Sequence, residues 1–244
     1  MSRLAGKRAL VVGGGTGIGL GIAVALAQEG CRVVIAGRRA DKLREAAETF
    51  KGEPPLLCHT VDVGDAGSVD ELVKWTLKEL GGIDFFVNSA GVNVLKRKMD
   101  ELSLEDWNSM MQINASGAFY CLRSILPHFR EKKDGLIVNV SSVAGKRASL
   151  LGGVGYSASK FAMTALGMTV GLEEAQHNIR VTNVYPGEVD TPILEKRPVP
   201  VSAEHRARIL KPEDVGAAVV MLALLPPRAN IPELIIKPTS QPYC

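Results

Sequence analysis

The sequence has few cysteines, few aromatic residues and no long apolar run, and each shortage narrows the class of protein. Its four cysteines, Cys31, Cys58, Cys121 and Cys244, lie far apart without a C-x-x-C pair. This spacing argues against a zinc site or a disulfide framework, and it fits a reducing compartment. No apolar run reaches the roughly 18–20 residues that a membrane-spanning helix needs.

Targeting signals and strong charge are also absent. The N-terminal residues, MSRLAGKRALVV, enter a predicted strand almost at once and carry no signal-peptide pattern, so we expect a cytoplasmic protein without a membrane segment. The net charge is +3 and both signs are interspersed, which argues against a nucleic-acid-binding stripe. We interpret the short basic cluster Lys96, Arg97 and Lys98 as a solvated loop.

What is present is an alternation of strand-like and helix-like segments. The chain has 244 residues, 46% of them hydrophobic, which suffices for one large core or two small ones. We expect strands at 8–12, 32–37, 55–63, 83–91, 135–142, 179–187 and 233–238. We expect helices at 19–30, 41–50, 68–80, 104–129, 155–176 and 211–225, with Ser68 as an N-cap and Glu71 completing its capping box.

This rhythm predicts an α/β fold, doubly wound, with helices on both faces of a parallel sheet. No linker divides the chain, so we expect a single domain over 1–244. The segment 192–211, PILEKRPVPVSAEHRARILK, is the one irregular stretch, and such an excursion between a strand and a helix is often a mobile lid over a site.

A glycine-rich loop joins the first strand to the first helix. In VVGGGTGIGLGIA (11–23), Gly13, Gly17 and Gly19 allow a tight turn and a close approach to a pyrophosphate at the helix N-terminus. A flexible βα turn would explain the glycines alone, but the position at the first βα junction favours a nucleotide site.

The end of the second strand bears on which dinucleotide fits. An acidic residue there would bind the ribose hydroxyls of NAD(H), but the chain reads AGRRADK. Arg38 and Arg39 are suited to a ribose 2′-phosphate, although they could also form a solvated helix start. The sequence therefore favours NADP(H) over NAD(H), with Arg38 the stronger candidate because it directly follows Gly37.

Two side chains in GYSASKFA (155–162) suggest acid–base chemistry. Tyr156 and Lys160 are one helical turn apart and share a face of the predicted helix. A free tyrosine has a pKa of about 10, and a nearby lysine cation favours the phenolate. Taken singly, Tyr156 could be a half-buried helix residue and Lys160 a surface charge.

Seven motifs in order make the chain similar to the short-chain dehydrogenase/reductase family over essentially its whole length. They are GGGTGIG (13–19), DV (62–63), NSAG (88–91), Asn114 in QINASGAF, NVSS (139–142), YSASK (156–160) and PGEVDTP (186–192). The resemblance implies a Rossmann-type, seven-stranded, mostly parallel sheet and a small-molecule carbonyl or alcohol substrate. It also implies a homo-oligomer, a tetramer or dimer, joined through the helices at 104–129 and 155–176.

The resemblance also implies roles for single residues. Asn114, Ser142, Tyr156 and Lys160 match the catalytic tetrad, in which Tyr156 exchanges the proton, Ser142 holds the same oxygen, Lys160 also binds the nicotinamide ribose and Asn114 holds a water. The implied cofactor contacts are Gly13, Gly15, Thr16, Gly17, Ile18, Gly19, Arg38, Arg39, Asp62, Val63, Asn88, Ala90, Gly91, Tyr156, Lys160, Pro186, Gly187, Val189 and Thr191.

Two departures and two open alternatives remain at this level. Ser142 lies 14 residues before Tyr156, one more than is common, so Ser141 is a weaker candidate for its role, and Thr16 stands where many NADP(H) users have a basic residue. Glu188 and Asp190 either line the pocket as polar groups or are exposed loop charges.

The predicted function is an NADP(H)-dependent carbonyl reductase or alcohol dehydrogenase. The alternatives are an NAD-linked alcohol or hydroxy-acid dehydrogenase and a non-catalytic nucleotide sensor. The substrate would lie among the loops near 92–98, 143–154 and 188–210.

Overall fold

Seven strands form one sheet in the computed structural model, which describes residues 2–242. Every neighbouring pair is parallel, so the expected doubly wound Rossmann-type sheet is confirmed. The strands are β1 (Arg8–Val12), β2 (Arg32–Gly37), β3 (Leu57–Thr60), β4 (Phe85–Asn88), β5 (Gly135–Val140), β6 (Ile179–Pro186) and β7 (Glu233–Ile236).

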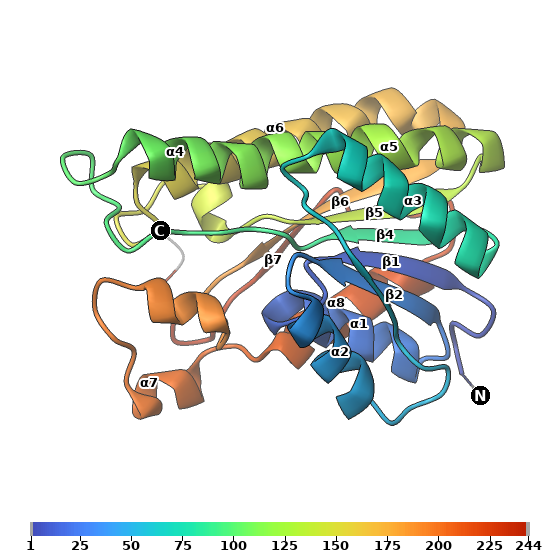
Figure 1. Cartoon of the computed structure of the whole chain (residues 1–244), viewed down its shortest axis with the longest axis horizontal. Helices are drawn as coiled ribbons and strands as arrows, with labels where there is room; N and C mark the ends of the chain where they lie inside the picture. The colour runs from blue at the N-terminus through green and yellow to red at the C-terminus, as the bar shows by residue number, and fades with distance from the viewer. Residues whose placement is uncertain (1, 243–244) are drawn as a thin grey trace.

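Helices cover both faces of this sheet (Figure 1). They are α1 (Gly17–Gln28), α2 (Ala40–Thr49), α3 (Ala66–Leu80), α4 (Leu104–Met110), α5 (Gly117–Lys132), α6 (Val154–Glu174), α7 (Ala203–Arg208) and α8 (Pro212–Leu224). In Figure 1, α3, α4, α5 and α6 lie above the sheet, and α1, α2 and α8 lie below it. Within residues 2–242, no helix is long and apolar enough to cross a membrane.

The apolar strands pack on both sides, which explains their continuous hydrophobic runs. In β1, Ala9 and Val11 belong to the core beneath α1, α2 and α8, whereas Leu10 and Val12 belong to the core beneath α3 and α5. A strand buried on both faces has no polar alternation, as expected for a parallel sheet between two helical layers.

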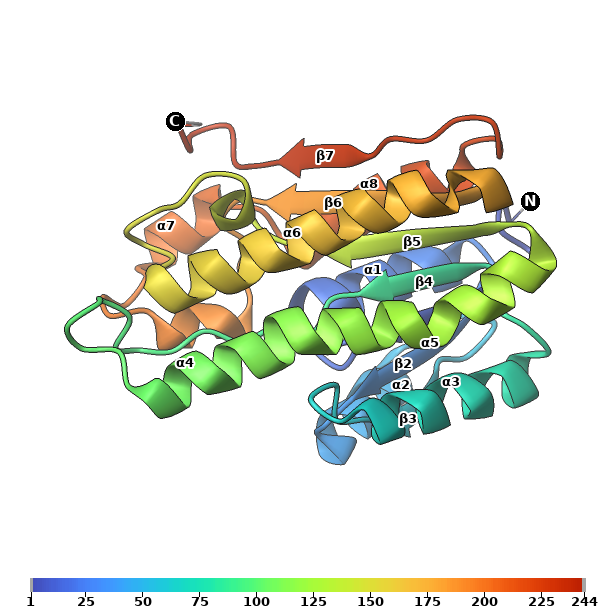
Figure 2. The ribbon, with the colours of Figure 1, turned by 90° about the horizontal axis from the view of Figure 1, so that it is seen from above.

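The strand order β3-β2-β1-β4-β5-β6-β7 reverses between β1 and β4. In open α/β sheets, ligands bind beyond the carboxyl ends of the strands at such a reversal. Figure 2 shows the strand arrows of β4 to β7 pointing toward the side where α7 and the start of α4 and of α6 lie. We therefore expect a ligand site at the loops that follow β1 and β4.

The start of α3 differs from the sequence prediction. Asp65, not Ser68, is the N-cap, and its side chain accepts a hydrogen bond from the backbone N–H of Gly67. The Ser68 hydroxyl instead accepts from the backbone N–H of Asp62 at 3.1 Å. Aspartate is as good an N-cap as serine, and starting the helix at Asp65 adds almost a turn.

The helix predicted over 104–129 is interrupted. A π-helical turn over Met111–Ser116 separates α4 from α5. Asn114 lies within this turn and is completely buried. The irregular segment 192–211 also holds more structure than predicted, because it contains a 3-10 turn at Pro192–Lys196 and the short helix α7.

Candidate active site

The glycine-rich loop after β1 adjoins the end of β4. Gly13 has a φ of +78°, and a Cβ added there would lie 2.6 Å from the backbone carbon of Ser89, so only glycine fits. Thr16 precedes α1 without a side-chain capping bond, and the first turn of α1 contains no acidic residue. The N–H groups at this helix start, with the positive end of the helix dipole, are thus left available to an anion.

Arginine rather than a carboxylate follows β2. The Arg39 guanidinium donates to the Thr16 hydroxyl at 3.2 Å, which places it beside the glycine-rich loop. Arg38 is exposed and borders a cavity of about 240 Å³. The other lining residues are Asp62, Gly64, Asp65, Ser109, Gln112 and Ile113.

The loop after β4 brings a buried amide and a catalytic candidate together. The Oδ1 of Asn88 accepts from the backbone N–H of Ala90 at 3.3 Å, but its Nδ2 has no partner among the described residues. A Cβ on Gly91 would lie 3.2 Å from the Nζ of Lys160. An unpaired buried amide beside a free helix N-terminus fits a ligand with phosphates and hydroxyls, such as a nicotinamide dinucleotide.

Further along the chain, Pro186 ends β6 at the same end of the sheet, and Gly187, Val189 and Thr191 follow it. The side chain of Thr191 is close enough to Gly17 that a Cβ there would lie 3.2 Å from the Cβ of Thr191. Val63 is buried against Gly117, and Asp62 is exposed. The fold therefore gathers the sequence-predicted cofactor contacts around the carboxyl ends of β1, β4 and β6.

The π-helical turn aims the Asn114 side chain at the loop after β4. Its Oδ1 accepts from the backbone N–H of Val92 at 2.8 Å, and its Nδ2 donates to the Val92 carbonyl and the Ser159 hydroxyl, both at 2.9 Å. Both amide hydrogens are thus in use. The predicted role of Asn114 in holding a water stays a prediction, and only the Oδ1 has spare capacity for it.

Lys160 is buried with few partners. Its Nζ donates to the Val140 carbonyl at 2.9 Å and lies 3.7 Å from the sulfur of Met163. Burial lowers the pKa of Lys160 to about 7. The Nζ is 5.8 Å from the centre of the Tyr156 ring, so the two side chains share one side of α6 as the spacing predicts.

Tyr156 is half-buried, and its surroundings differ from the sequence expectation. Burial raises the pKa of Tyr156, while a side-chain hydrogen bond with Ser142 and the charge of Arg97 work in the opposite direction. Arg97 thus adds a positive charge near the phenol that the sequence did not indicate. A partly protonated lysine with a pKa near 7 is a weaker source of positive charge than a guanidinium.

The structure distinguishes the two serines at the end of β5. Ser142 accepts from the backbone N–H of Ala144 at 3.1 Å and interacts with Tyr156. Ser141 is buried, donates to the Lys160 carbonyl at 3.2 Å and contacts the Thr164 hydroxyl at 3.1 Å. Of the two, Ser142 is the one placed beside the phenol.

Glu188 and Asp190 are neither free pocket carboxylates nor isolated loop charges. Each binds cations from the segment that follows it, and together they fasten 197–211 to the end of β6. Glu188 pairs with Arg197 at 3.0 Å and His205 at 2.6 Å, and Asp190 pairs with Arg206 at 2.6 Å and Lys211 at 2.8 Å. His205 thus has a partner that its sequence position did not indicate.

The reading of Lys96–Lys98 as a solvated loop is wrong for its central residue. Arg97 is only 6% exposed, whereas Lys96 and Lys98 are exposed. Its guanidinium donates to three backbone carbonyls, those of Val94 at 3.0 Å, Leu151 at 2.7 Å and Lys196. A basic triplet carries no periodic burial signal, so the only clue in the sequence was its place in a loop expected to border the substrate.

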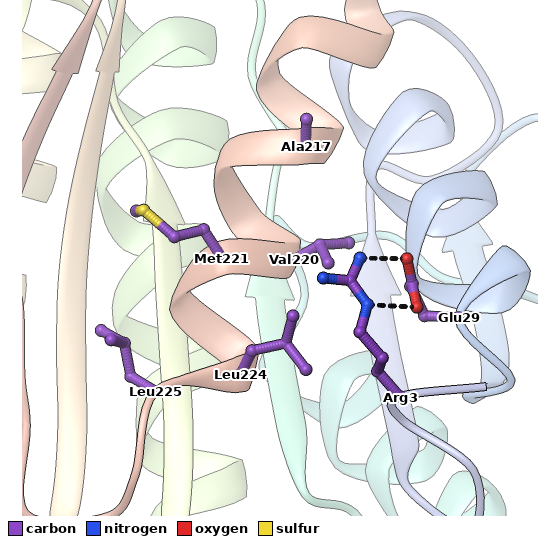
Figure 3. Close-up of a pocket in the computed structure, with 7 residues that line it drawn as sticks. All are labelled: Arg3, Glu29, Ala217, Val220, Met221, Leu224 and Leu225. Atoms are coloured by element: carbon purple, nitrogen blue, oxygen red, sulfur yellow. Dashed lines mark hydrogen bonds and ion pairs between the residues drawn. The ribbon is translucent and has the colours of Figure 1, made fainter. Parts of the chain in front are cut away.

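A cavity of about 420 Å³ lies away from this cluster, between α8 and the end of α1 (Figure 3). Its walls are apolar residues of α8 and the segment after it, including Val220, Met221 and Leu224, with the Arg3–Glu29 ion pair facing them. It contains none of the predicted site residues. Within residues 2–242, no group of three His, Cys, Asp or Glu side chains could hold a metal ion.

Comparisons with known proteins agree with the geometry. A family model described as short chain dehydrogenase matches residues 7–199. The chain belongs to the short-chain dehydrogenase/reductase family. An uncharacterized oxidoreductase of Staphylococcus aureus (strain MRSA252) is 33% identical over 238 residues, 98% of this chain and 100% of that protein.

Solved structures of similar dehydrogenases contain either form of the cofactor. An alcohol dehydrogenase from the archaeon Thermococcus sibiricus, complexed with 5-hydroxy-NADP, has a TM-score of 0.87 and 30% identity, covering 97% of this chain and 98% of that one. A 3-ketoacyl-(acyl-carrier-protein) reductase from Brucella melitensis, complexed with NADH, has a TM-score of 0.86 and 28% identity, covering 96% and 98%. This short-chain dehydrogenase/reductase is thus an oxidoreductase of CH–OH and C=O groups with a nicotinamide-binding fold.

Proposed function

We propose that the protein is an NADP(H)-dependent oxidoreductase that transfers hydride between the nicotinamide and a carbonyl or secondary alcohol, with Tyr156 as general acid and base. The observation that carries this proposal is the convergence of Ser142, Tyr156 and Lys160 beside Gly91 and the buried Asn114 at the carboxyl end of the sheet. An acidic hydroxyl, a second hydroxyl and an amine within one small region match the needs of carbonyl reduction.

The residues that would hold the cofactor are the glycine-rich loop with the start of α1, the loop after β4 and the loop after β6. When bound, the nicotinamide supplies or accepts the hydride. Preference for the phosphorylated form is supported by Arg38 and Arg39 and by the lack of a carboxylate directly after β2. The Arg39–Thr16 bond supports a phosphate role, because it holds a cation beside the loop that Thr16 ends.

In the reducing direction, the Tyr156 hydroxyl would give its proton to the substrate oxygen while Ser142 donates a hydrogen bond to the same atom. A raised pKa suits this, because the phenol then stays protonated near neutral pH. Lys160 lies within 5.8 Å of the ring centre and would replenish the proton or bind the ribose. In the oxidising direction, Arg97 and Lys160 would stabilise the phenolate.

Several broader statements belong to the same proposal. We expect the chain 1–244 to act as one domain in the cytoplasm, as a homo-oligomer. Exposed large apolar side chains on α5 and α6 support such an assembly: Phe119, Phe161, Met168 and Leu172. An NAD-linked dehydrogenase is the alternative that the NADH-bound relative keeps open, and a sensor without turnover would have no use for Tyr156.

The test is nicotinamide absorbance with a panel of ketones, aldehydes and hydroxy acids, run with NADPH/NADP⁺ and with NADH/NAD⁺. We expect turnover that prefers the phosphorylated cofactor. Arg38→Glu should lower kcat/KM with NADPH by about 100-fold, because it places a negative charge against a phosphate, and should affect NADH little.

The matched control is Arg44→Glu, an exposed cation on α2, which should leave the cofactor ratio unchanged. If Arg38→Glu alters both cofactors equally, the assignment to NADP(H) is wrong. If folded, cofactor-bound protein turns over nothing in the panel, the sensor becomes the better explanation.

A further inference from the structure

Arg97 is a buried cation near Tyr156 that the catalytic tetrad does not include. We infer that Arg97 binds the carboxylate of the substrate, so that the enzyme acts on a small organic acid bearing a ketone or a secondary hydroxyl; this inference rests on the oxidoreductase function proposed above. Four observations carry it: the position of Arg97, its charge, its spare donors and the loops that meet around it.

The position of Arg97 is fixed against the helix that carries Tyr156. The Arg97 carbonyl accepts from the backbone N–H of Val154, in the first turn of α6, at 3.2 Å. A Cβ added to Gly153 would lie 2.6 Å from the Cβ of Arg97, so the two segments touch. Arg97 is near enough to act electrostatically on the Tyr156 hydroxyl.

Its charge lacks an anionic partner. A guanidinium stays protonated in proteins, and a buried charge is costly unless it is paired. Among residues 2–242, no ion pair joins Arg97 to a carboxylate, and its acceptors are three neutral carbonyls. The neighbouring cation Arg197 opposes it, but Arg197 is itself paired with Glu188.

Its donors are not exhausted. A guanidinium has five N–H groups in a fork that matches a carboxylate, and the three carbonyls of Val94, Leu151 and Lys196 account for three of them. A carboxylate arriving at the remaining donors would supply both the missing hydrogen bonds and the missing negative charge. An anionic ligand at this position would therefore gain more binding free energy than a neutral one.

The three acceptors come from three different loops, those expected to surround the substrate. Val94 follows β4, Leu151 precedes α6 and Lys196 ends the 3-10 turn that begins at Pro192. Asn93 adds a second link, because its amide donates to the Gly152 carbonyl at 3.1 Å. Arg97 thus holds together the walls of the substrate region while keeping its own charge uncompensated.

The substrate carboxylate takes no part in the reaction itself. In reduction, the bound nicotinamide would supply the hydride to the carbonyl carbon and Tyr156 would give its proton to the carbonyl oxygen, so the keto acid would become a hydroxy acid, the cofactor would be left oxidised and the phenolate would regain a proton from Lys160. The carboxylate stays ionised on Arg97 and sets which end of the substrate faces Tyr156. Acetoacetate is the simplest probe of this class, and acetoacetamide is its neutral counterpart.

The experiment compares acid and amide in the wild-type enzyme and in two Arg97 variants. We expect kcat/KM for acetoacetate to exceed that for acetoacetamide by at least about tenfold. Arg97→Gln should raise KM for the acid by about 30-fold with little change in kcat, and should change the amide by less than about threefold. Arg97→Lys should keep part of the acid preference, since it keeps the charge but loses the fork.

A binding measurement makes the result independent of turnover. Butanoate and butanamide are titrated into the enzyme–NADPH complex, followed by nicotinamide fluorescence, and we expect the acid alone to bind measurably. Lys96→Gln is the matched control, an exposed cation in the same loop that should leave the acid preference intact.

Equal losses for acid and amide in Arg97→Gln would show that Arg97 only fastens the loops, and would overturn the inference. So would a wild-type enzyme that binds butanamide as well as butanoate. If Arg97→Gln does not fold, the inference is tested by Arg97→Lys and by the comparison of acid with amide in the wild-type enzyme. Turnover of neutral ketones without acid preference refutes the carboxylate site alone, whereas butanoate binding without any turnover refutes the proposed reaction alone.

Discussion

Asp84, at the amino end of the sheet, and Arg97, beyond its carboxyl end, are buried charges in opposite surroundings. At the amino end, Asp84 accepts from the backbone N–H and the Nε of Arg8, both at 2.9 Å, and pairs with Lys132. Burial would raise the pKa of Asp84, but the hydrogen bonds from Arg8 and Lys132 outweigh it and lower the value to about 2. Every partner that this carboxylate needs is already in the chain.

At the carboxyl end, the buried groups are left incomplete. The Arg97 guanidinium donates to carbonyls but is paired with no carboxylate, and the Nδ2 of Asn88 has no hydrogen-bond partner in the described chain. Lys160 has one carbonyl and a thioether, and burial lowers its pKa to about 7. For these groups the difference is that Asp84 has its partners within the fold, whereas Arg97, Asn88 and Lys160 keep binding capacity that a ligand would use.

The sharpest test of this division is Tyr156→Phe. We expect kcat to fall about 1000-fold, because the proton donor is removed, while the protein folds and binds NADPH as before. Steady-state absorbance assays and a fluorescence titration of NADPH measure the two quantities. Unchanged kcat would mean that another group transfers the proton.

At the amino end, Asp84→Asn should have the second largest effect, and on stability instead of catalysis. Removing the carboxylate leaves Arg8 and Lys132 without their buried anion, which should cost about 3 kcal/mol of unfolding free energy at pH 7. Urea denaturation measures this, and kcat below the unfolding transition should be retained. A loss of kcat in folded protein would contradict the view that Asp84 serves stability and not catalysis.

The pH dependence of the same variant gives a further check. The folded-state pKa of Asp84 lies below its ordinary value of 3.8, so its stabilisation is present above about pH 4 and is lost as the pH falls through about 2. The stability difference between wild type and Asp84→Asn should shrink over that window. Asp134→Asn, whose carboxylate is 3.7 Å from Lys132 and more exposed, should cost less than about 0.5 kcal/mol.

Lys160→Met should abolish activity but raise the stability of the fold, which is opposite to the usual effect of replacing a buried residue. The folded-state pKa of Lys160, about 7, lies below the ordinary lysine value of 10.5, so below pH 7 the amine is protonated in both the folded and the unfolded state and the folded state bears the full cost of a buried charge. From pH 7 to 10.5 the unfolded state binds more protons, so wild-type stability rises with pH and the advantage of the variant fades.

We expect an advantage of about 2 kcal/mol at pH 6, measured by urea denaturation. Lys74→Met, at an exposed position of α3, should change stability by less than about 0.5 kcal/mol at either pH. A Lys160 variant that is less stable than wild type at every pH would show that this amine stabilises the fold.

The smallest expected effect comes from a glycine at the amino end. Gly81 ends α3 with a φ of +73° and has no atom within 4 Å of an added Cβ, so Gly81→Ala should cost about 1 kcal/mol and leave kcat unchanged. Gly13→Ala, with a similar φ but the backbone of Ser89 2.6 Å away, should cost more and lose cofactor binding. Thermal denaturation and NADPH titration of the pair test this, and equal effects would contradict it.

The sequence predicted the sheet and the helical layers well, because apolar runs reflect local constraints, whereas its assignment of the cofactor loops stays a prediction. It misplaced the start of α3, since Asp65 and Ser68 are both good caps and only the fold decides between them. It could not foresee that Arg97 is buried, because that depends on three loops meeting. The roles of the four catalytic candidates stay predictions, although the fold brings Ser142, Tyr156 and Lys160 together.

The π-helical turn at Met111–Ser116 makes the length of this segment as consequential as its composition. Its hydrogen bonds run from i to i+5 instead of i to i+4, so the turn takes up one extra residue between α4 and α5 and leaves α4 packed along α6. Trp107 and Met110, which border Gly155 at the start of α6, would keep their places after a one-residue deletion that restored a regular helix. The deletion would instead remove the turn that aims the Asn114 side chain at the loop after β4, so chain length would act as a determinant of where this catalytic candidate lies.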